Sequence, residues 1–137
     1  SNQNAEKLIP KTIKCLKENI QIPIYGNGDN IRDWIHVEDH VKALDLVYHT
    51  GKMGEHYNVG GSNEYSNLEL VKLICRNYDT LKGVVPGTGA RLISFVNDRA
   101  GHDLRYSINY DKIYAKLSLK PEINFSLGLV ETIKSYM

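Results

Sequence analysis

The stretch Ile22-Pro-Ile-Tyr-Gly-Asn-Gly-Asp-Asn-Ile-Arg-Asp-Trp-Ile35 decides the fold class. Its two short apolar runs, 22–25 and 31–35, flank a Gly/Asn cluster, which predicts paired or adjacent strands joined by a tight turn. The cluster at 26–30 lacks the third glycine of a dinucleotide-binding fingerprint, and no helix follows it at once. We therefore expect a plain turn there that does not bind a dinucleotide.

Helical spacing appears on both sides of this stretch. Residues 5–19 carry apolar side chains at three- and four-residue steps, with Pro10 in the first turn, where a missing N–H costs little. Residues 38–49 predict a second helix, with Glu38 and Asp39 at the positive end of its dipole. The residues that we expect this second helix to bury are Val41, Leu44, Val47 and Tyr48.

The remaining chain continues the alternation of helices and short strands. A strand is predicted over 56–59, ending at Gly60-Gly61, and Ser66 with Glu69 forms a capping box that starts a third helix. Its buried face should carry Val71, Ile74 and Tyr78. A Gly/Pro-rich mobile loop over 82–90, a strand over 92–96, a short helix capped by Asn109 and running to Leu117, and a last helix from Asn124 to Tyr136 complete the pattern. The fold class is α/β.

Composition narrows the class of protein. With 137 residues, 42% hydrophobic and 24% charged, the chain fits one globular domain with a real core. A net charge of +1 argues against nucleic-acid binding, and no apolar run reaches the ~20 residues of a membrane span. No secretory signal is present, so we expect a cytoplasmic protein. Cys15 and Cys75 fall in helical patterns and are expected to be buried thiols rather than a disulfide.

Two polar clusters are candidates for chemistry. His36 and His40 have the spacing of metal ligands on a helix, but no third ligand is evident, so a polar helix start is favoured and no metal is expected. Residues 98–106 (Asp-Arg-Ala-Gly-His-Asp-Leu-Arg-Tyr) place two arginines, two aspartates and a histidine around a glycine. This run is either a solvated loop or a phosphate-binding segment, which Lys7 and Arg32 could join as further cations.

Several segments occur in an order and spacing found in one enzyme family. They are Glu6-Lys-Leu-Ile-Pro10, Pro23-Ile-Tyr-Gly-Asn-Gly28, Arg32-Asp-Trp-Ile-His-Val-Glu-Asp-His40, Tyr57-Asn-Val-Gly-Gly61 and Asp98 through Tyr106. Together they resemble the dTDP-glucose 4,6-dehydratases of the extended short-chain dehydrogenase/reductase family. The Arg-Asp-Trp and Tyr-Asn-Val-Gly-Gly segments are shared with related epimerases and decarboxylases, whereas the run from Gly101 to Tyr106 is more specific to the dehydratases.

The resemblance implies a substrate-binding lobe within a two-part enzyme. The NAD-binding Rossmann domain would be mostly missing from residues 1–137, with residues 34–61 as a candidate edge of it. The full-length lyase, expected to be a homodimer, would convert dTDP-glucose to dTDP-4-keto-6-deoxyglucose, a rhamnose precursor. This chain would bind the dTDP-sugar, hold no catalytic residue and be inactive alone. The alternatives are the substrate domain of a UDP-sugar epimerase or decarboxylase, and a non-catalytic nucleotide-binding module.

The same resemblance carries over a set of substrate-binding residues. Ala100 departs from the proline common in the family, so its loop should be less rigid before binding. The set comprises Lys7, Leu8, Pro23, Ile24, Tyr25, Arg32, Asn67, Asp98, Arg99, Ala100, Gly101 and His102.

Overall fold

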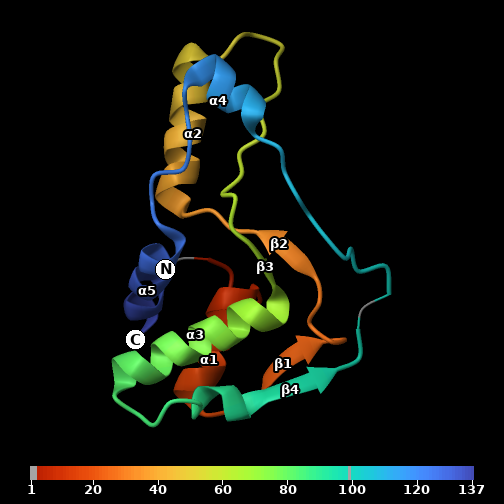
Figure 1. Cartoon of the computed structure of the whole chain (residues 1–137), viewed down its shortest axis with the longest axis vertical. Helices are drawn as coiled ribbons and strands as arrows, with labels where there is room; N and C mark the ends of the chain where they lie inside the picture. Colours follow the sequence, from red (N-terminus) through yellow and green to blue (C-terminus); the bar gives the residue numbers. More distant parts are fainter. Residues whose placement is uncertain (1–2, 99) are drawn as a thin grey trace.

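The fold, seen in a computed structural model that describes residues 3–98 and 100–137, alternates helices with short strands as expected (Figure 1). The elements in chain order are α1 (Leu8–Glu18), β1 (Ile22–Tyr25), β2 (Ile31–Asp33), α2 (Val37–Thr50), β3 (Glu64–Ser66), α3 (Asn67–Lys82), the 3-10 turn η1 (Gly89–Leu92), β4 (Ile93–Val96), α4 (Asp111–Leu117) and α5 (Phe125–Tyr136). No helix in the described ranges is long and apolar enough to cross a bilayer.

The strands pair differently from the sequence prediction. β1 runs parallel to β4, and β2 runs antiparallel to β3, so of the two expected arrangements, paired or adjacent strands, the pairing of β1 with β2 is wrong. The turn between them directs the chain toward α3 instead: the carbonyl oxygens of Gly28 and Asn30 accept hydrogen bonds of 3.0 Å from the N–H groups of Leu68 and Asn67. Gly28 has a φ of 77°, a conformation that glycine adopts without strain.

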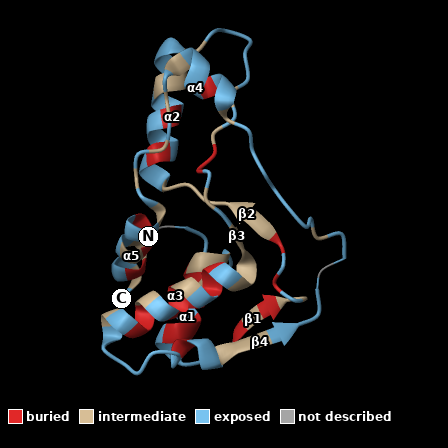
Figure 2. Cartoon of the chain, in the orientation of Figure 1, coloured by how far each residue is buried: buried red, intermediate tan, exposed pale blue. Residues whose placement is uncertain are grey.

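The hydrophobic core lies where α1, α3 and α5 meet β1, and Figure 2 shows most buried residues on these elements. Ile13, Ile22 and Ile74 are at most 1% exposed there. Cys15 and Cys75 are buried free thiols, as expected. Burying several such side chains, each worth about 1.5–3 kcal/mol, is what fixes the β1 strand against the helices.

The predicted helix caps are largely confirmed. Ser66 accepts a hydrogen bond from the Glu69 N–H while the Glu69 carboxylate accepts from the Ser66 N–H, which is a complete capping box. Asn124 accepts from the Leu127 N–H at the start of α5. The start of α4 differs slightly, because Tyr110 is the capping residue and Asn109 bonds to the Asp111 N–H from one residue further out.

A separate arm, formed by α2 and α4, extends away from the main core (Figure 1). The prediction that α2 buries its apolar face is wrong. Ala43 is buried and Val47 is half-buried, but the other three predicted side chains are exposed because only the short α4 and the segment before α5 cover the helix (Figure 2). The exposed fractions are 54% for Val41, 57% for Leu44 and 85% for Tyr48.

The link between this arm and the core depends on Asp33 rather than on a strand at 56–59. That predicted strand is absent from the described chain, since no described strand lies beside it to share hydrogen bonds. The Asp33 carboxylate instead accepts hydrogen bonds of 2.8 Å from the N–H groups of Gly61 and Asn63. This arrangement fixes the end of β2, and therefore its neighbour Arg32.

Candidate functional site

A cavity of about 360 Å³ opens between the start of α1, the strand β1 and the strand β2. Many of the residues predicted to bind substrate line it. They are Lys7, Leu8, Pro23, Ile24, Tyr25, Arg32, Asn67 and His102, joined by Gln3, Glu6, Lys11, Thr12, Ile22 and Trp34. The fold therefore brings together residues that lie up to 99 positions apart in the sequence.

The first turn of α1 contributes positive charge to one wall. Lys7 caps the helix and Lys11 follows one turn later, so both side chains lie on the face that lines the cavity. The first turn contains no acidic residue, and the helix dipole adds partial positive charge at this end. Glu6 is the carboxylate on the same wall. The α1 end of the cavity is thus suited to an anion.

Arg32 contributes a planar cation to the cavity lining. One terminal nitrogen donates to the Ile31 carbonyl at 2.6 Å and the other donates to the Asp103 carbonyl at 3.0 Å. Its guanidinium carbon lies 4.5 Å from the centre of the Tyr106 ring. A guanidinium has five N–H donors, so these two bonds leave donors for a ligand in the cavity.

Strand β1 supplies the apolar wall. Ile22 and Ile24 point into the core and are 1% exposed, whereas Pro23 and Tyr25 alternate with them and are half-buried. The parallel partner β4 holds this register, with Pro23 opposite Ser94 and Tyr25 opposite Val96. A proline and an aromatic ring on one strand face form a flat surface suited to packing against a planar group.

Asn67 lies at the first position of α3, at the edge of the cavity. The backbone N–H groups of this helix end are already used, because Asn67 donates to Asn30, Leu68 donates to Gly28 and Glu69 donates to the Ser66 side chain. A dinucleotide cradle needs such N–H groups free for a diphosphate. The start of α3 therefore has no free N–H among these three residues for a diphosphate.

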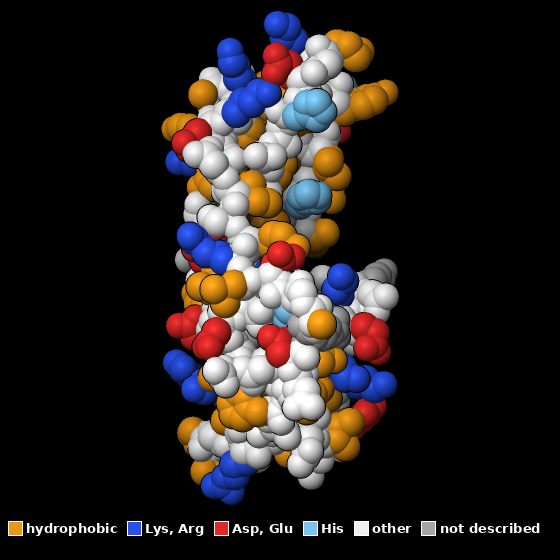
Figure 3. Space-filling model, turned by 90° about the vertical axis from the view of Figure 1, so that its right-hand side faces the viewer, with side chains coloured by type: hydrophobic (Ala, Val, Ile, Leu, Met, Phe, Trp, Pro, Cys, Tyr) orange, Lys and Arg blue, Asp and Glu red, His pale blue; other side chains and the backbone are white. Residues whose placement is uncertain are grey.

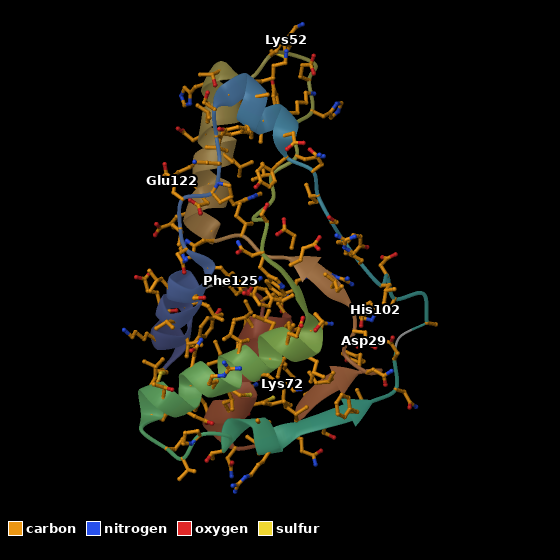
Figure 4. All side chains as sticks on the ribbon, in the orientation of Figure 1. Asp29, Lys52, Lys72, His102, Glu122 and Phe125 are labelled. Carbon is orange, nitrogen blue, oxygen red and sulfur yellow. The ribbon has the colours of Figure 1, made fainter. Side chains whose placement is uncertain are left out.

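The charged segment 98–106 reaches the cavity only in part. Figure 4 shows His102 beside the β1–β2 turn that carries Asp29. The His102 Nδ1 lies 2.9 Å from the Asp98 carboxylate, which in turn packs over Gly26. Asp98, Ala100 and Gly101 are exposed and do not line the cavity in the described chain. The predicted contact of Arg99 lies outside the described residues.

The cations do not all converge. Lys7, Lys11 and Arg32 share the cavity, but Arg105 donates to the Glu64 carboxylate at 2.8 and 3.1 Å. Figure 3 shows the charges of both signs interspersed over the face that carries this segment. Of the cations that the sequence analysis offered for a phosphate site, Lys7 and Arg32 thus line one cavity, whereas Arg105 is paired with Glu64 away from it.

Sequence reasoning missed two kinds of residue around the cavity. Lys11 and Thr12 lie on the same helix face as Lys7 and Leu8, so helical spacing could have found them. Asp103 and Tyr106 contact Arg32 from outside the cavity. They lie next to Arg32 because Leu104 and Tyr106 form backbone hydrogen bonds with Ile31. No sequence signal indicates that pairing.

A second, largely apolar groove of about 660 Å³ runs between the start of α2 and α5. It is lined by Ile9, Trp34, His36, Val37 and Tyr136, among others. The Trp34 indole N–H and the Tyr136 hydroxyl are buried without a hydrogen-bond partner among the described residues. Buried donors of this kind normally have an acceptor, so their presence beside one groove is unusual.

The two histidines of the predicted helix start are not placed as metal ligands. His36 caps α2, with its Nδ1 accepting from the Glu38 N–H at 3.3 Å, as a polar helix start requires. No group of three or more His, Cys, Asp or Glu side chains is arranged to hold a metal ion in residues 3–98 and 100–137.

The alternating fold and the cavity at the ends of β1 and β2 define a class: part of an extended short-chain dehydrogenase/reductase of the dehydratase and epimerase type. The family profile described as GDP-mannose 4,6 dehydratase matches residues 1–132, and the chain belongs to that family.

The proteins to which this chain is similar include several dTDP-glucose 4,6-dehydratases. A dTDP-glucose 4,6-dehydratase from Haemophilus influenzae is 47% identical over 98% of this chain and 41% of its own length. The structure of a Bacillus anthracis dTDP-glucose 4,6-dehydratase in complex with NAD is 41% identical, with a TM-score of 0.83 over 98% of this chain and 40% of its own. A Streptomyces venezuelae dTDP-glucose 4,6-dehydratase with NAD and TYD bound is 36% identical, with a TM-score of 0.86 over 98% and 39%. This chain thus spans about two fifths of the length of these proteins.

Proposed function

We propose that this chain is the nucleotide-sugar-binding part of a dTDP-glucose 4,6-dehydratase, a lyase that converts dTDP-glucose to dTDP-4-keto-6-deoxyglucose. The observation that carries the proposal is one cavity in which Lys7, Lys11 and Arg32 face an apolar wall made by Pro23 and Tyr25. The similarity to dTDP-glucose 4,6-dehydratases over 98% of the chain supports it.

The chemistry of the cavity suits a nucleoside diphosphate. Two lysines and the α1 dipole offer point charges, and Arg32 offers planar paired donors that match phosphate oxygens. Pro23 and Tyr25 would pack against the base, and Ile24 between them would contribute through its backbone, because its side chain points into the core. Asn67 and His102 add polar groups at the edges, where they would bond to the nucleotide.

The 98–101 segment would close over the bound nucleotide. Asp98, Ala100 and Gly101 are exposed beside the cavity rather than in its wall. Gly101 has a φ of 71°, and a Cβ there would meet no atom within 4 Å, so the backbone is free to approach a ligand. Together with Arg99, these residues complete the proposed contact set.

We propose no catalytic residue within this chain. NAD and the reacting groups would be held by a Rossmann domain formed mostly by other residues of the full-length protein, because the 26–30 turn lacks the third glycine of a dinucleotide-binding fingerprint. A cytoplasmic homodimer is the proposed setting, on the basis of the family resemblance. This chain alone would be inactive.

The Rossmann domain would dock on the α2 arm and the apolar groove, with residues 34–61 at its edge. Val41, Leu44 and Tyr48 form an exposed apolar stripe on α2. Contiguous apolar surface of this kind marks an interface.

Leu44→Asp tests the proposed docking. Because Leu44 is 57% exposed in this chain, the substitution should leave unfolding of the 137-residue chain within about 0.5 kcal/mol of wild type. It should lower the unfolding temperature of the full-length protein. Ile108→Asp, at a residue 44% exposed outside α2, is the matched control. Equal effects of the two substitutions on the full-length protein would contradict the docking.

The main alternative is the substrate domain of a UDP-sugar epimerase or decarboxylase. Calorimetric titration of the full-length protein with dTDP and with UDP separates the two functions. We expect a preference for dTDP, and a clear preference for UDP would overturn the proposal. Binding of neither nucleotide would also overturn it, whereas binding by a full-length protein that lacks any Rossmann domain would favour a non-catalytic module.

A substitution of Arg32 tests whether the nucleotide binds in the cavity. Arg32→Ala should weaken dTDP binding about 10- to 100-fold, because a charge-assisted hydrogen bond contributes about 1.5–3 kcal/mol. Arg91→Ala is the matched control, since Arg91 is exposed on η1 and does not line the cavity. Equal affinities of the two variants would show that the nucleotide binds elsewhere.

A further inference from the structure

The orientation of Arg32 is fixed from outside the cavity. Its guanidinium carbon lies 4.5 Å from the centre of the Tyr106 ring, and its terminal nitrogen donates to the Asp103 carbonyl at 3.0 Å. Neither Tyr106 nor Asp103 is among the described residues that line the cavity. Their side-chain and carbonyl contacts with Arg32 join them to the cavity wall.

Tyr106 is itself held in place. Its hydroxyl donates to the Asp103 carboxylate, and its backbone N–H donates to the Ile31 carbonyl at 3.1 Å. The Ile31 N–H donates to the Leu104 carbonyl at 2.7 Å, so residues 104–106 are bonded along the edge of β2. The ring thus faces Arg32 as part of the sheet edge and not as a free surface side chain.

The partners of Arg32 leave its positive charge available. A carboxylate bonded directly to the guanidinium would compete with an anionic ligand, but the guanidinium contacts two backbone carbonyls and an aromatic face instead. The nearby Asp103 carboxylate is bonded to the Tyr106 hydroxyl. This hydrogen bond, more than any other cause, raises the pKa of Tyr106, so the hydroxyl stays protonated and remains a donor.

We infer that Tyr106 and Asp103 are positioning residues that hold the Arg32 guanidinium in one orientation for the diphosphate of the nucleotide sugar. This inference rests on the proposed function. A free arginine side chain loses about 2 kcal/mol of rotamer entropy when a ligand fixes it. A side chain that is already fixed by Tyr106 and Asp103 avoids most of that loss when the diphosphate binds.

The test is a double-mutant cycle on dTDP affinity, measured by calorimetry on the full-length protein. Tyr106→Leu removes the ring and should weaken dTDP binding about tenfold, and Tyr106→Phe keeps the ring and should weaken it about threefold. In the Arg32→Ala background, Tyr106→Leu should change the affinity less than twofold. Tyr114→Leu is the matched control, because Tyr114 is 52% exposed and Tyr106 is 54% exposed.

The outcomes separate the inference from the proposed function. If the wild-type protein does not bind dTDP, the proposed function fails and the inference falls with it. If wild type binds but Tyr106→Leu matches Tyr114→Leu, only the positioning role is overturned. A tenfold loss that persists in the Arg32→Ala background would also overturn it, because the effect would then be independent of Arg32. Should Tyr106→Leu unfold, Tyr106→Phe with and without Arg32→Ala provides the same cycle.

Discussion

The Gly61→Ala substitution tests how the α2 arm is joined to the core. A Cβ at this position would lie 1.9 Å from the Trp34 carbonyl oxygen, 2.7 Å from the Trp34 carbonyl carbon and 3.0 Å from the Ile35 Cα. All three are backbone atoms, so no side-chain rotation relieves the overlap. A C···O contact needs roughly 3.3 Å, and the loop must therefore move away from the end of β2 by about 1 Å or more.

That movement would also break a hydrogen bond. The Gly61 N–H donates to the Asp33 carboxylate at 2.8 Å, and a bond of this kind contributes about 1.5–3 kcal/mol. Overpacking adds about 1–3 kcal/mol. The expected loss is about 2.5–6 kcal/mol, a large share of the roughly 5–15 kcal/mol that stabilises a typical domain.

Urea unfolding of the 137-residue chain measures this loss directly. The chain has one tryptophan, Trp34, whose carbonyl is the group that the new methyl would strike, so its fluorescence reports the affected region. Gly54→Ala is the control: Gly54 has a φ of 80° with no atom near a Cβ, so its cost is backbone strain of about 1–2 kcal/mol. If Gly61→Ala costs no more than Gly54→Ala, the close approach is not a constraint on the fold.

Three smaller changes probe other contacts. Ser66→Ala should lower the urea midpoint of unfolding by an amount that corresponds to about 1 kcal/mol, because it removes half of the capping box with Glu69; no change would contradict the cap. Asp79→Ala should lower the free energy of unfolding by about 3 kcal/mol in the same assay, because the buried Gly89 N–H loses its carboxylate acceptor. A decrease below about 1 kcal/mol would contradict a stabilising role for this hydrogen bond. Burial, and to a smaller extent the neighbouring Asp79, raises the pKa of Cys75 from 9.0 to about 12. The stability that this thiol contributes is therefore complete below pH 9 and decreases as the pH rises from 9 to 12. Cys75→Ala should flatten that pH dependence of the unfolding free energy, and an unchanged slope would assign it to other groups.

Local signals in the sequence predicted most elements because each depends on neighbouring residues. The Ser66–Glu69 capping box, the Asn124 cap and the apolar repeat at Val71 and Ile74 each act within one or two helical turns. Strand pairing could not be predicted in the same way. Parallel pairing of β1 with β4 joins segments about 70 residues apart, and a Gly/Asn turn after β1 carries no information about a partner that distant.

In the candidate site, too, contacts between neighbouring residues could be predicted and contacts between distant segments could not. Helical spacing places Lys7 beside Lys11, and strand alternation places Pro23 beside Tyr25, so both walls of the cavity follow from local rules. The meeting of Arg32 with Asp103 and Tyr106 does not, because it requires residues 104–106 to lie along Ile31. The family resemblance supplied the candidate residues on both walls but gave no indication of the contacts behind Arg32.

The wrong prediction for α2 is informative about the whole protein. The apolar repeat at Val41, Leu44 and Tyr48 has the spacing of a buried helix face, yet in this chain those side chains are more than half exposed. A helix in a chain that already has a complete core would gain nothing from such a stripe, and it would risk aggregation. The apolar spacing of α2 and the exposure of its side chains are both explained if the stripe packs against another domain of the full-length protein. The proposed Rossmann domain is such a domain, and it would cover the stripe.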